Sequence, residues 1–504
     1  MNTKAHNNEN QKVSATGGDL EGAMAKYELV VGLEVHAQLS TLSKAFSSDS
    51  AAFGAEPNHH ISAISLGHPG TLPRLNKKMV EYAIKMGLAC NCSINLQNSF
   101  ARKNYFYADL PKGYQITQDQ AAVCLGGFVP VRLTGGISKN IAIHHIHMEE
   151  DAGKSMHDNH SEDSLIDLNR AGVPLIEIVS EPDMRSSEEA GQFLTEIRKL
   201  LRYLDICDGN MEEGSMRCDA NISVRLKGET TYGNRCEVKN LNSIRNVQRA
   251  IDHEFVRQVA IIENGGHIDQ NTLNFNADTG ETSVLRSKEM ANDYRYFPEP
   301  DLMPLVLDIA FVNQIKSELP ALPNQLYKKY TEQLGLSDYD AGVITADREL
   351  ALYFEELVKH TSNHKAAVHL LMGPVKSRLN EIGGSVSGLG IQPNNLAVII
   401  KLVDSGLINN SVASQKLFPA LLKQPAKNAE ELARELNLLI SADNNEVNQY
   451  ISDAIAKFPD KVIEYQKGKK GVLGLFMGEI MKSSKGKIDP QATNQLLIKE
   501  LESR

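Results

Sequence analysis

Three short segments of the sequence alternate charged or polar residues with apolar ones: residues 27–39, 217–225 and 235–239. In an extended strand every second side chain points to the same face of the sheet. Each segment therefore predicts a strand with one apolar face and one face that carries carboxylates or imidazoles. The acidic and imidazole groups on these polar faces are Glu34, His36, Asp219 and Glu237.

A fourth segment, residues 144–151, reads HHIHMEED and adds imidazoles and carboxylates, among them Glu149. Mg²⁺ binds through a few carboxylates together with the phosphates of a substrate. If the four segments meet in one sheet, their polar faces could hold such a cation. The alternative for each strand taken alone is an ordinary solvated sheet face, which alternates in the same way.

Zinc is a competing interpretation of the same segment, because it contains His144, His145 and His147. Neighbouring residues of a strand point to opposite faces, so at most two of the three imidazoles are expected to share a metal. Of the cysteines, Cys90 and Cys92 have no second pair at zinc-site spacing. We expect reduced thiols and a cytoplasmic protein.

The motifs of common phosphate-binding loops and catalytic nucleophiles are missing. There is no G-x-x-x-x-G-K-[ST] loop, no G-x-G-x-x-G after a predicted strand and no G-x-S-x-G elbow. Phosphate chemistry on this chain would therefore use a metal ion and basic side chains. The sequence offers no nucleophile for covalent hydrolysis.

The elements that must position these residues belong to a chain of 504 residues, long enough for about three domains. Residues 1–26 are polar and without periodicity, which predicts a disordered leader. Short alternating segments up to residue 305, with a helix expected at 187–204, predict an α+β domain around an antiparallel sheet. Beyond residue 320 apolar residues recur at helical spacing, which predicts an all-α remainder.

Charge is distributed unevenly along the chain. The formal net charge is −10, from 53 Lys and Arg against 63 Asp and Glu, which argues weakly against nucleic-acid binding. Residues 467–487 are instead locally positive and contain one glutamate and six lysines: Lys467, Lys469, Lys470, Lys482, Lys485 and Lys487. A solvated lysine-rich surface is the alternative interpretation of this segment. No stretch approaches the roughly 18 consecutive apolar residues of a membrane helix.

Longer motifs run through these segments. They are GLEVHAQL (32–39), RKNYFYADLPKGYQI (102–116), MEEDAGK (148–154), DLNRAGVPLIEIVSEPD (167–183), DGNMEEGSMRCDANISVR (208–225), EVKNLNS (237–243) and DYRYFPEPDLMPL (293–305). On these motifs the chain, from about residue 27 to its end, closely resembles the B subunits of tRNA-dependent aspartyl/glutamyl-tRNA amidotransferases.

The resemblance implies one subunit of a heterotrimeric ligase that converts Glu-tRNA(Gln) or Asp-tRNA(Asn) to the amide. The B subunit is implied to bind misacylated tRNA, to activate the side-chain carboxylate with ATP and Mg²⁺, and to deliver ammonia to it. An amidase partner, the A subunit, releases that ammonia from glutamine, and a small C subunit joins the two. The implied domains are a cradle domain at 27–305, a helical domain at 306–430 and a tRNA-binding tail domain at 431–504.

Individual residues acquire roles through the same resemblance. The implied catalytic and metal site contains Glu34, His36, Glu149, Asp219 and Glu237, with Glu150 as an alternative to Glu149 because both lie in one motif. An ammonia route is implied along Lys103, Tyr105 and Tyr107, although tyrosines that merely pack are the alternative. The six lysines of 467–487 are implied to contact the phosphates of tRNA.

The chain departs from the family pattern in one loop. Many members carry FCxC…CPxCLG, whereas this chain reads FSSD…SAISLG and has Ser47, Asp49, Ser62 and Ser65 at the four cysteine positions. Hydroxyls and one carboxylate are poor substitutes for thiolate ligands. We therefore expect no structural zinc, and a loop held by packing around Phe46, Phe53 and Pro69 instead.

Two rival functions remain open at this point. One is a non-catalytic tRNA-binding scaffold whose partner performs the activation chemistry. The other is a free-standing ATP-dependent ligase, which the missing glutamine-hydrolysing nucleophile disfavours. The sequence also leaves open whether Glu-tRNA(Gln), Asp-tRNA(Asn) or both serve as substrate.

Overall fold

The computed structural model describes residues 17–157, 163–287, 294–440, 444–484, 488 and 490–503. The chain divides into two compact units, Met1–Pro323 and Asn324–Arg504. The first unit is α+β and is built on one large sheet, whereas the described part of the second unit is helical.

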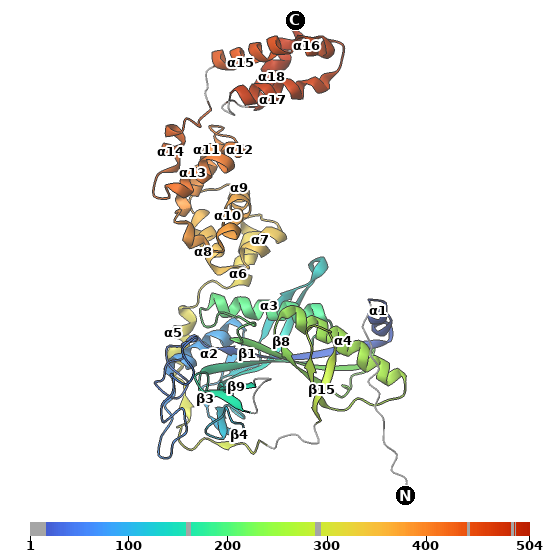
Figure 1. Ribbon diagram of the computed structural model, residues 1–504, viewed down its shortest axis with the longest axis vertical. Helices are drawn as coiled ribbons and strands as arrows, with labels where there is room; N and C mark the ends of the chain where they lie inside the picture. The colour runs from blue at the N-terminus through green and yellow to red at the C-terminus, as the bar shows by residue number, and fades with distance from the viewer. Residues whose placement is uncertain are drawn as a thin grey trace. The chain divides into compact units, whose positions relative to one another are not determined.

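The large sheet has β1 (Tyr27–Gln38) at its centre (Figure 1). On one side of β1 follow β12 (Met216–Leu226), β13 (Cys236–Leu241), β14 (Asn271–Phe275) and β15 (Thr282–Ser287). On the other side follow β11 (Pro174–Ser180), β8 (Ser138–Glu150), β5 (Tyr114–Thr117), β4 (Ala101–Asn104) and β16 (Phe297–Pro298). Neighbouring strands along this path are antiparallel except β13 and β14, which are parallel.

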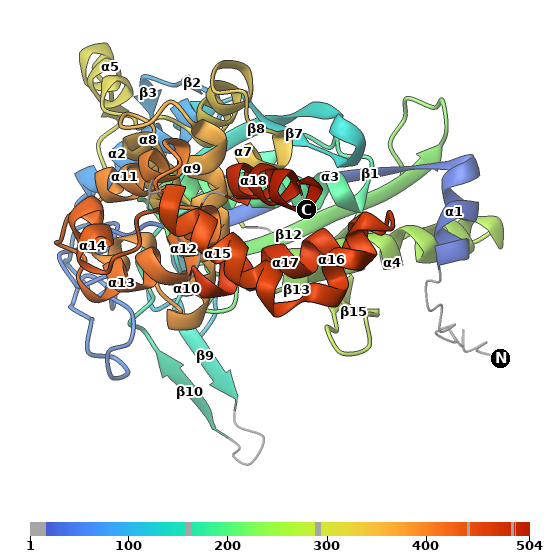
Figure 2. The same cartoon turned by 90° about the horizontal axis from the view of Figure 1, so that it is seen from above.

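Shorter strands complete the first unit. β7 (Phe128–Arg132) and β6 (Cys124–Leu125) both pair with β8, and β6 also pairs with β2 (Ser93–Ile94). Two separate ribbons are formed by β9 (Lys154–His157) with β10 (Ser164–Asp167), which projects clearly in Figure 2, and by β3 (Gln97–Asn98) with β17 (Leu305–Val306).

Three helices cover one face of this sheet: α2 (Lys77–Ala89), α3 (Ser187–Tyr203) and α4 (Ile244–Glu263) (Figure 1). Their apolar faces share a core with the buried side chains of β1 at Leu33, Val35 and Ala37. Since side chains alternate along a strand, Glu34 and His36 are left on the opposite face. The helix expected at 187–204 is confirmed as α3, which begins after a Ser186 N-cap that accepts a hydrogen bond from Glu189 N.

The leader differs from the expectation over part of its length. Residues 17–26 form helix α1 (Gly17–Lys26), which packs on α4 and buries Ala23. Its last residue, Lys26, forms a 2.5 Å ion pair with Glu263, and the Tyr27 hydroxyl donates to the same carboxylate at 2.6 Å. This anchoring at the end of α4 explains why a polar segment is ordered here. Residues 1–16 of the expected leader lie outside the described residues.

The first unit also extends beyond residue 305, where the sequence placed the domain boundary. Helix α5 (Ile309–Ser317) packs on α2 and contributes Val312 and Ile315 to the core of this unit. The boundary consequently falls at Pro323, the second of two prolines that break the chain after α5.

The second unit begins with a series of short helices. They are α6 (Pro323–Lys328), α7 (Asp338–Ile344), α8 (Arg348–Leu357), α9 (His364–Leu370), α10 (Lys376–Ile382), α11 (Pro393–Asp404), α12 (Asn410–Val412), α13 (Phe418–Lys423) and α14 (Ala429–Glu435). Four more follow: α15 (Asn444–Lys457), α16 (Pro459–Gln466), α17 (Leu473–Ser483) and α18 (Pro490–Glu502). These last four surround a core of their own that includes Ile451, Phe476 and Leu497. None of the described helices is both long enough and apolar enough to cross a membrane.

Candidate functional site

The register of the central strands brings polar residues from distant parts of the sequence side by side. Glu34 of β1 lies opposite Asp219 of β12, and His36 of β1 lies opposite Glu177 of β11. Glu177 in turn lies opposite His147 of β8. All five face away from the helices, so the sheet presents one continuous polar row across four strands.

This row forms the floor of a cavity of about 530 Å³ on the open face of the sheet. Its walls come from strands on both sides of β1 and from the segment before β16. The lining residues are Glu34, His36, Lys103, Thr117, Gln118, Asp119, His145, His147, Glu177, Val179, Asp219, Asn221, Arg235, Glu237, Lys239, Thr272, Tyr294 and Tyr296. The polar faces predicted from separate segments therefore converge.

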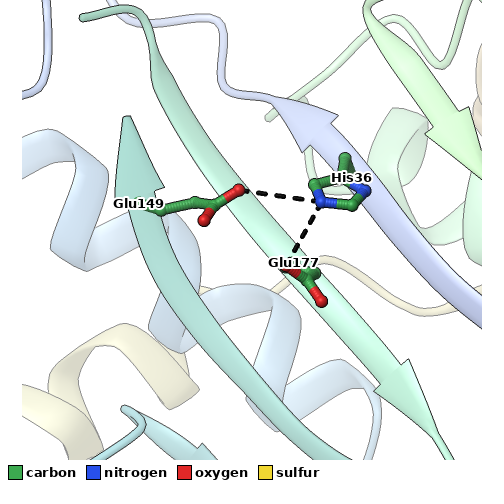
Figure 3. A group of neighbouring side chains, drawn as sticks. All are labelled: His36, Glu149 and Glu177. Atoms are coloured by element: carbon green, nitrogen blue, oxygen red, sulfur yellow. Dashed lines mark ion pairs between the residues drawn. The ribbon is translucent and has the colours of Figure 1, made fainter. Parts of the chain in front are cut away.

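One half of the floor holds His36 and Glu177, which with the buried Glu149 beside them form what we define as the imidazole cluster (Figure 3). His36 Nε2 lies 3.2 Å from Glu177 Oε2 and 3.7 Å from Glu149 Oε1. Each residue offers one ligand atom within 4.8 Å of the others. His147 Nε2 approaches the same carboxylates, at 3.5 Å from Glu177 and 3.8 Å from Glu149.

Charges within the imidazole cluster stabilise one another. Burial disfavours the imidazolium of His36, but the Glu177 and Glu149 carboxylates outweigh burial and raise the pKa of His36 to about 9. Burial likewise opposes ionisation of Glu177, yet His36, His147 and Lys103 hold the pKa of its carboxyl well below the usual range. Without a bound cation, this cluster is a set of paired opposite charges.

The other half of the floor holds the acidic cluster, which we define as Glu34, Asp219 and Glu237. Their ligand oxygens also lie within 4.8 Å of one another. Lys239 forms ion pairs with Asp219 and, at 2.9 Å, with Glu237. Asn221 Nδ2 donates to Glu34 at 2.8 Å.

Negative charge is in excess in the acidic cluster. Burial, together with the carboxylates of Glu177, Glu237 and Asp219, raises the pKa of Glu34. A carboxyl whose pKa rises in this way favours either a proton or a cation beside it. Oxygen-rich groups of this kind fit a hard divalent cation such as Mg²⁺, and the single imidazole of the first cluster is compatible with it.

The three histidines of β8 do not form a converging metal site. His144 Nδ1 lies 2.6 Å from His145 Nδ1, and His145 Nε2 lies 3.0 Å from His147 Nδ1, so the rings form a row. His144 and His145 were expected on opposite faces. They meet because Val179 pairs with His145 and Ser180 with Ile143, which leaves His144 as the extra residue of a β-bulge. Burial and the adjacent imidazoles lower the pKa of His145 to about 4.

Glu149 and Glu150 lie on opposite faces of β8, which separates the two alternatives for the site. Glu149 joins the imidazole cluster, whereas Glu150 forms an ion pair with Lys112 and accepts a 2.9 Å hydrogen bond from Ile116 N. Glu150 lines a different cavity, of about 130 Å³. The geometry therefore groups Glu149, and not Glu150, with Glu34 and His36.

Several functional-site residues were missed in the sequence. Glu177 belongs to the imidazole cluster, and Lys239 and Asn221 contact the acidic cluster, but none of the three was among the expected site residues. Glu177 had a detectable signal, because it is the only charged residue of the strand PLIEIVS and apolar residues flank it on both sides. Lys239 alternates with Glu237 and is expected on the same face, but the sequence alone assigned it no role in the site.

The residues of the implied ammonia route occupy two environments. Lys103 lines the main cavity, where its Nζ lies 5.0 Å from the centre of the Tyr294 ring. The Tyr105 hydroxyl donates to Gln115 at 3.3 Å, and its ring meets those of Tyr107 and Tyr294 edge to face. Tyr107 is 55% exposed in this chain, so it does not by itself line a route closed to solvent.

The loop with the altered cysteine pattern is held by hydrogen bonds around one carboxylate. Asp49 accepts from the hydroxyls of Ser62, at 2.8 Å, and Ser65, and its N–H donates to Ser47 Oγ at 3.3 Å. Burial opposes ionisation, but these hydrogen bonds lower the pKa of Asp49.

The prediction that packing around Phe46, Phe53 and Pro69 holds that loop is wrong for two of these three residues. Phe46 is buried and meets Phe100 edge to face at 5.6 Å. Phe53, however, is 85% exposed, and Pro69 is exposed as well. Ser62 and Ser65 instead donate to the Asp49 carboxylate, which satisfies their hydroxyls and removes the need for an apolar cover.

The lysines of residues 467–487 are exposed where the structure describes them. Lys467, Lys469 and Lys470 lie between α16 and α17, and Lys482 lies near the end of α17. Lys469 has one acidic neighbour, Glu464, at 3.5 Å. Lys485 and Lys487 lie outside the described residues.

Comparison with known proteins finds relatives along nearly the whole chain. Residues 29–313 match the family described as GatB/GatE catalytic domain, and residues 352–501 match the GatB domain. A protein of Caldicellulosiruptor bescii is 46% identical over 480 residues, which cover 95% of this chain and 99% of the relative. Relatives in Syntrophotalea carbinolica and Rickettsia felis are also 46% identical, over 477 and 484 residues, with 95% and 96% of this chain and 99% of each relative covered. All three are named as the B subunit of an aspartyl/glutamyl-tRNA(Asn/Gln) amidotransferase.

Proposed function

The chain belongs to the family of aspartyl/glutamyl-tRNA(Asn/Gln) amidotransferase B subunits, and we propose that its sheet cavity is where the misacylated tRNA is activated and amidated. The protein is part of a ligase-type enzyme that amidates misacylated tRNA with glutamine as nitrogen donor. The observation that carries the proposal is the convergence of two ligand clusters on one face of the sheet, where every member except the buried Glu149 lines one cavity.

The reaction needs activation because a carboxylate is a poor electrophile. Its charge repels nucleophiles, and oxide is a poor leaving group, so transfer of a phosphoryl group from ATP makes the carboxylate reactive. Mg²⁺, when bound, neutralises charge on the phosphates during this transfer. The imidazole cluster and the acidic cluster are the residues that would hold it. Lys103, Arg235 and Lys239 line the same cavity and supply positive charge for phosphate oxygens.

Ammonia must come from elsewhere, since the sequence contains no motif for a glutamine-hydrolysing nucleophile. A glutaminase partner, the A subunit, joined through a small C subunit, would supply it. Ammonia has to travel as the neutral molecule, away from bulk water. We propose that it reaches the cavity past Lys103 and Tyr105, with Tyr107 covered by one of these partners in the complex.

The tRNA body would be held by the exposed lysines around α16 and α17. Contacts of this kind position a nucleic acid through its phosphates and do not read its sequence. The local excess of lysine supports this role despite the net charge of −10 for the chain. Glu-tRNA(Gln) and Asp-tRNA(Asn) both remain candidates for the substrate.

A reconstituted complex tests the proposal. Wild type, Glu149→Ala and Asp219→Ala would each be supplied with ATP, glutamine and one misacylated tRNA, Glu-tRNA(Gln) or Asp-tRNA(Asn). Both variants are expected to bind tRNA like wild type and to lose amidation. A non-catalytic scaffold would instead keep most of its amidation in both variants, which would overturn the proposal. Lys139→Met serves as a control, because Lys139 pairs with Glu189 at 2.7 Å and does not line the cavity.

A further inference from the structure

The Lys239 ammonium contacts the same groups that would bind a cation in the acidic cluster. It pairs with the Asp219 carboxylate and lies 2.9 Å from Glu237 Oε1. Glu34, Asp219 and Glu237 each offer an oxygen within 4.8 Å of the others. An ammonium and a divalent cation would therefore compete for two of these three carboxylates.

The backbone is shaped to aim Lys239 at Asp219. Cys218 pairs with Leu241 and Ala220 pairs with Val238, so Lys239 and Asn240 together lie opposite Asp219 alone. This is a β-bulge, a feature that redirects side chains and is common beside active sites. Asn240 has a φ of 64°, in the left-handed region that asparagine adopts more readily than most residues. The Nδ2 group of Asn240 also donates to Phe275 O at 3.2 Å, which ties the bulge to the neighbouring strand.

We propose that Lys239 is a positioning residue that couples divalent-cation binding to phosphate binding in the acidic cluster. Its ammonium neutralises Asp219 and Glu237 while no cation is bound, and it leaves these oxygens when a cation takes them. The proposal rests on the function proposed above, because it assumes that the acidic cluster binds a cation.

Electrostatics explains why the two events are linked. A divalent cation and an ammonium a few ångströms apart repel each other, so cation binding alone requires Lys239 to give up its carboxylate partners. Lys239 lines the cavity, and a phosphate there offers the displaced ammonium new acceptor oxygens. Binding of the cation and the nucleotide together is therefore more favourable than the separate binding of either one would predict. By linkage, each must raise the affinity of the other by the same factor.

The imidazole cluster is paired differently: among the described residues, the ion-pair partners of Glu149 and Glu177 are the imidazoles of His36 and His147. A neutral imidazole nitrogen can itself ligate a metal ion. A lysine ammonium has three donors and no acceptor, so Lys239 must move aside. This difference singles out Lys239 as the residue that makes one cluster depend on phosphate.

The experiment measures binding of Mn²⁺ by the assembled complex in a Glu177→Gln background, which weakens the imidazole cluster and isolates the acidic one. Free Mn²⁺ is followed by electron paramagnetic resonance, with and without a non-hydrolysable ATP analogue. The chains compared carry Lys239 unchanged, Lys239→Met, Lys239→Gln or Lys239→Arg. Lys139→Met is the matched control, because it removes an ion-paired lysine remote from the cavity.

Lys239→Met and Lys239→Gln should each bind Mn²⁺ alone at least about tenfold more tightly than the unchanged chain, since a competing charge is gone. In both, the increase in Mn²⁺ affinity caused by the ATP analogue should shrink. Lys239→Arg and Lys139→Met should behave like the unchanged chain. Thermal melting confirms that each variant is folded, and the two neutral variants provide independent readings.

Two results would overturn the inference, and they differ from each other. In the first result, the neutral variants bind Mn²⁺ with the same affinity as the unchanged chain, and the ATP analogue raises that affinity by the same factor in all of them. Lys239 then does not couple the two ligands, although the cation site exists. If neither the unchanged chain nor the variants bind Mn²⁺, the acidic cluster is not a cation site, and the metal assignment in the proposed function fails as well.

Discussion

The two halves of the cavity floor contain similar groups but balance their charges differently. In the imidazole cluster, His36 and His147 lie among the carboxylates and pair with them directly. In the acidic cluster the balancing group is Lys239, which reaches its partners from a β-bulge on β13. A neutral imidazole can ligate a metal ion, whereas an ammonium has no acceptor and competes with the cation for its carboxylates.

The largest expected effect comes from removing one carboxylate of each cluster. Glu177→Gln and Asp219→Asn should each lower kcat for amidation by at least about 100-fold, more than is usual for residues that only support metal ligands. Affinity for tRNA should stay within about twofold of wild type in gel-shift titrations, because neither residue belongs to the lysine segment that would contact the phosphates. If kcat falls by different factors in the two variants, the cluster with the larger loss contributes more to catalysis. A variant that keeps its kcat would show that its cluster takes no part in the chemistry.

A variant in the second unit separates tRNA binding from chemistry. Changing Lys467, Lys469, Lys470 and Lys482 together to alanine should weaken tRNA binding by about tenfold or more at moderate salt. The slope of log Kd against log salt should become shallower, while turnover at saturating tRNA changes little. Deletion of residues 431–504 should act in the same direction. Unchanged affinity after the deletion would show that the tail does not hold the tRNA.

The pH dependence of stability tests whether the charges of the imidazole cluster are paired in the cation-free protein. The pKa of His36 rises from 6.5 to about 9 on folding, so its stabilising charge is fully present below pH 6.5 and is lost as pH rises through about 9. In EDTA-treated protein, Tm should therefore fall between pH 6.5 and 9 more steeply for wild type than for His36→Gln. Parallel Tm curves for the two proteins would contradict the paired state of this cluster.

The smallest effect concerns the hydrogen bond that supports Glu34. Asn221→Ala removes the 2.8 Å bond to Glu34 Oε1 and should lower the free energy of unfolding by about 1.5 kcal/mol, as expected for a bond to a charged group. Urea unfolding of the cation-free protein measures this change. Thr117→Val is the counterpart in the imidazole cluster, where the bond from Thr117 to Glu149 is longer, at 3.3 Å. A larger loss for Thr117→Val than for Asn221→Ala would reverse the expected order.

Part of this site could be predicted because its residues carry a local signal. Alternation in 33–39 and 217–225 placed Glu34, His36 and Asp219 on polar faces, and the structure puts them there. Glu177 was missed because a single carboxylate in an otherwise apolar strand does not repeat, so it produces no polar–apolar alternation. Glu149 and Glu150 could not be separated, since alternation says that they face opposite ways but not which face is polar.

A β-bulge accounts for another difference between expectation and structure. His144 is the extra residue of this bulge in β8, and so it meets His145. A bulge breaks the period of two on which strand predictions depend. The short helix α1 was missed for a different reason, because its order depends on contacts of Lys26 and Tyr27 with Glu263, far away in the sequence.

By itself, the sequence determined the chemistry available to this protein: hard oxygen donors, imidazoles and basic groups on alternating strands, with no motif for a nucleophile of its own. Through its long motifs it also identified the amidotransferase family, which the relatives in other organisms confirm. Only the tertiary structure decided that β1 lies between β11 and β12, and so which donors meet. The reason is physical. The direction of a side chain follows from its local backbone, whereas strand order and register depend on packing between segments that are far apart in the chain.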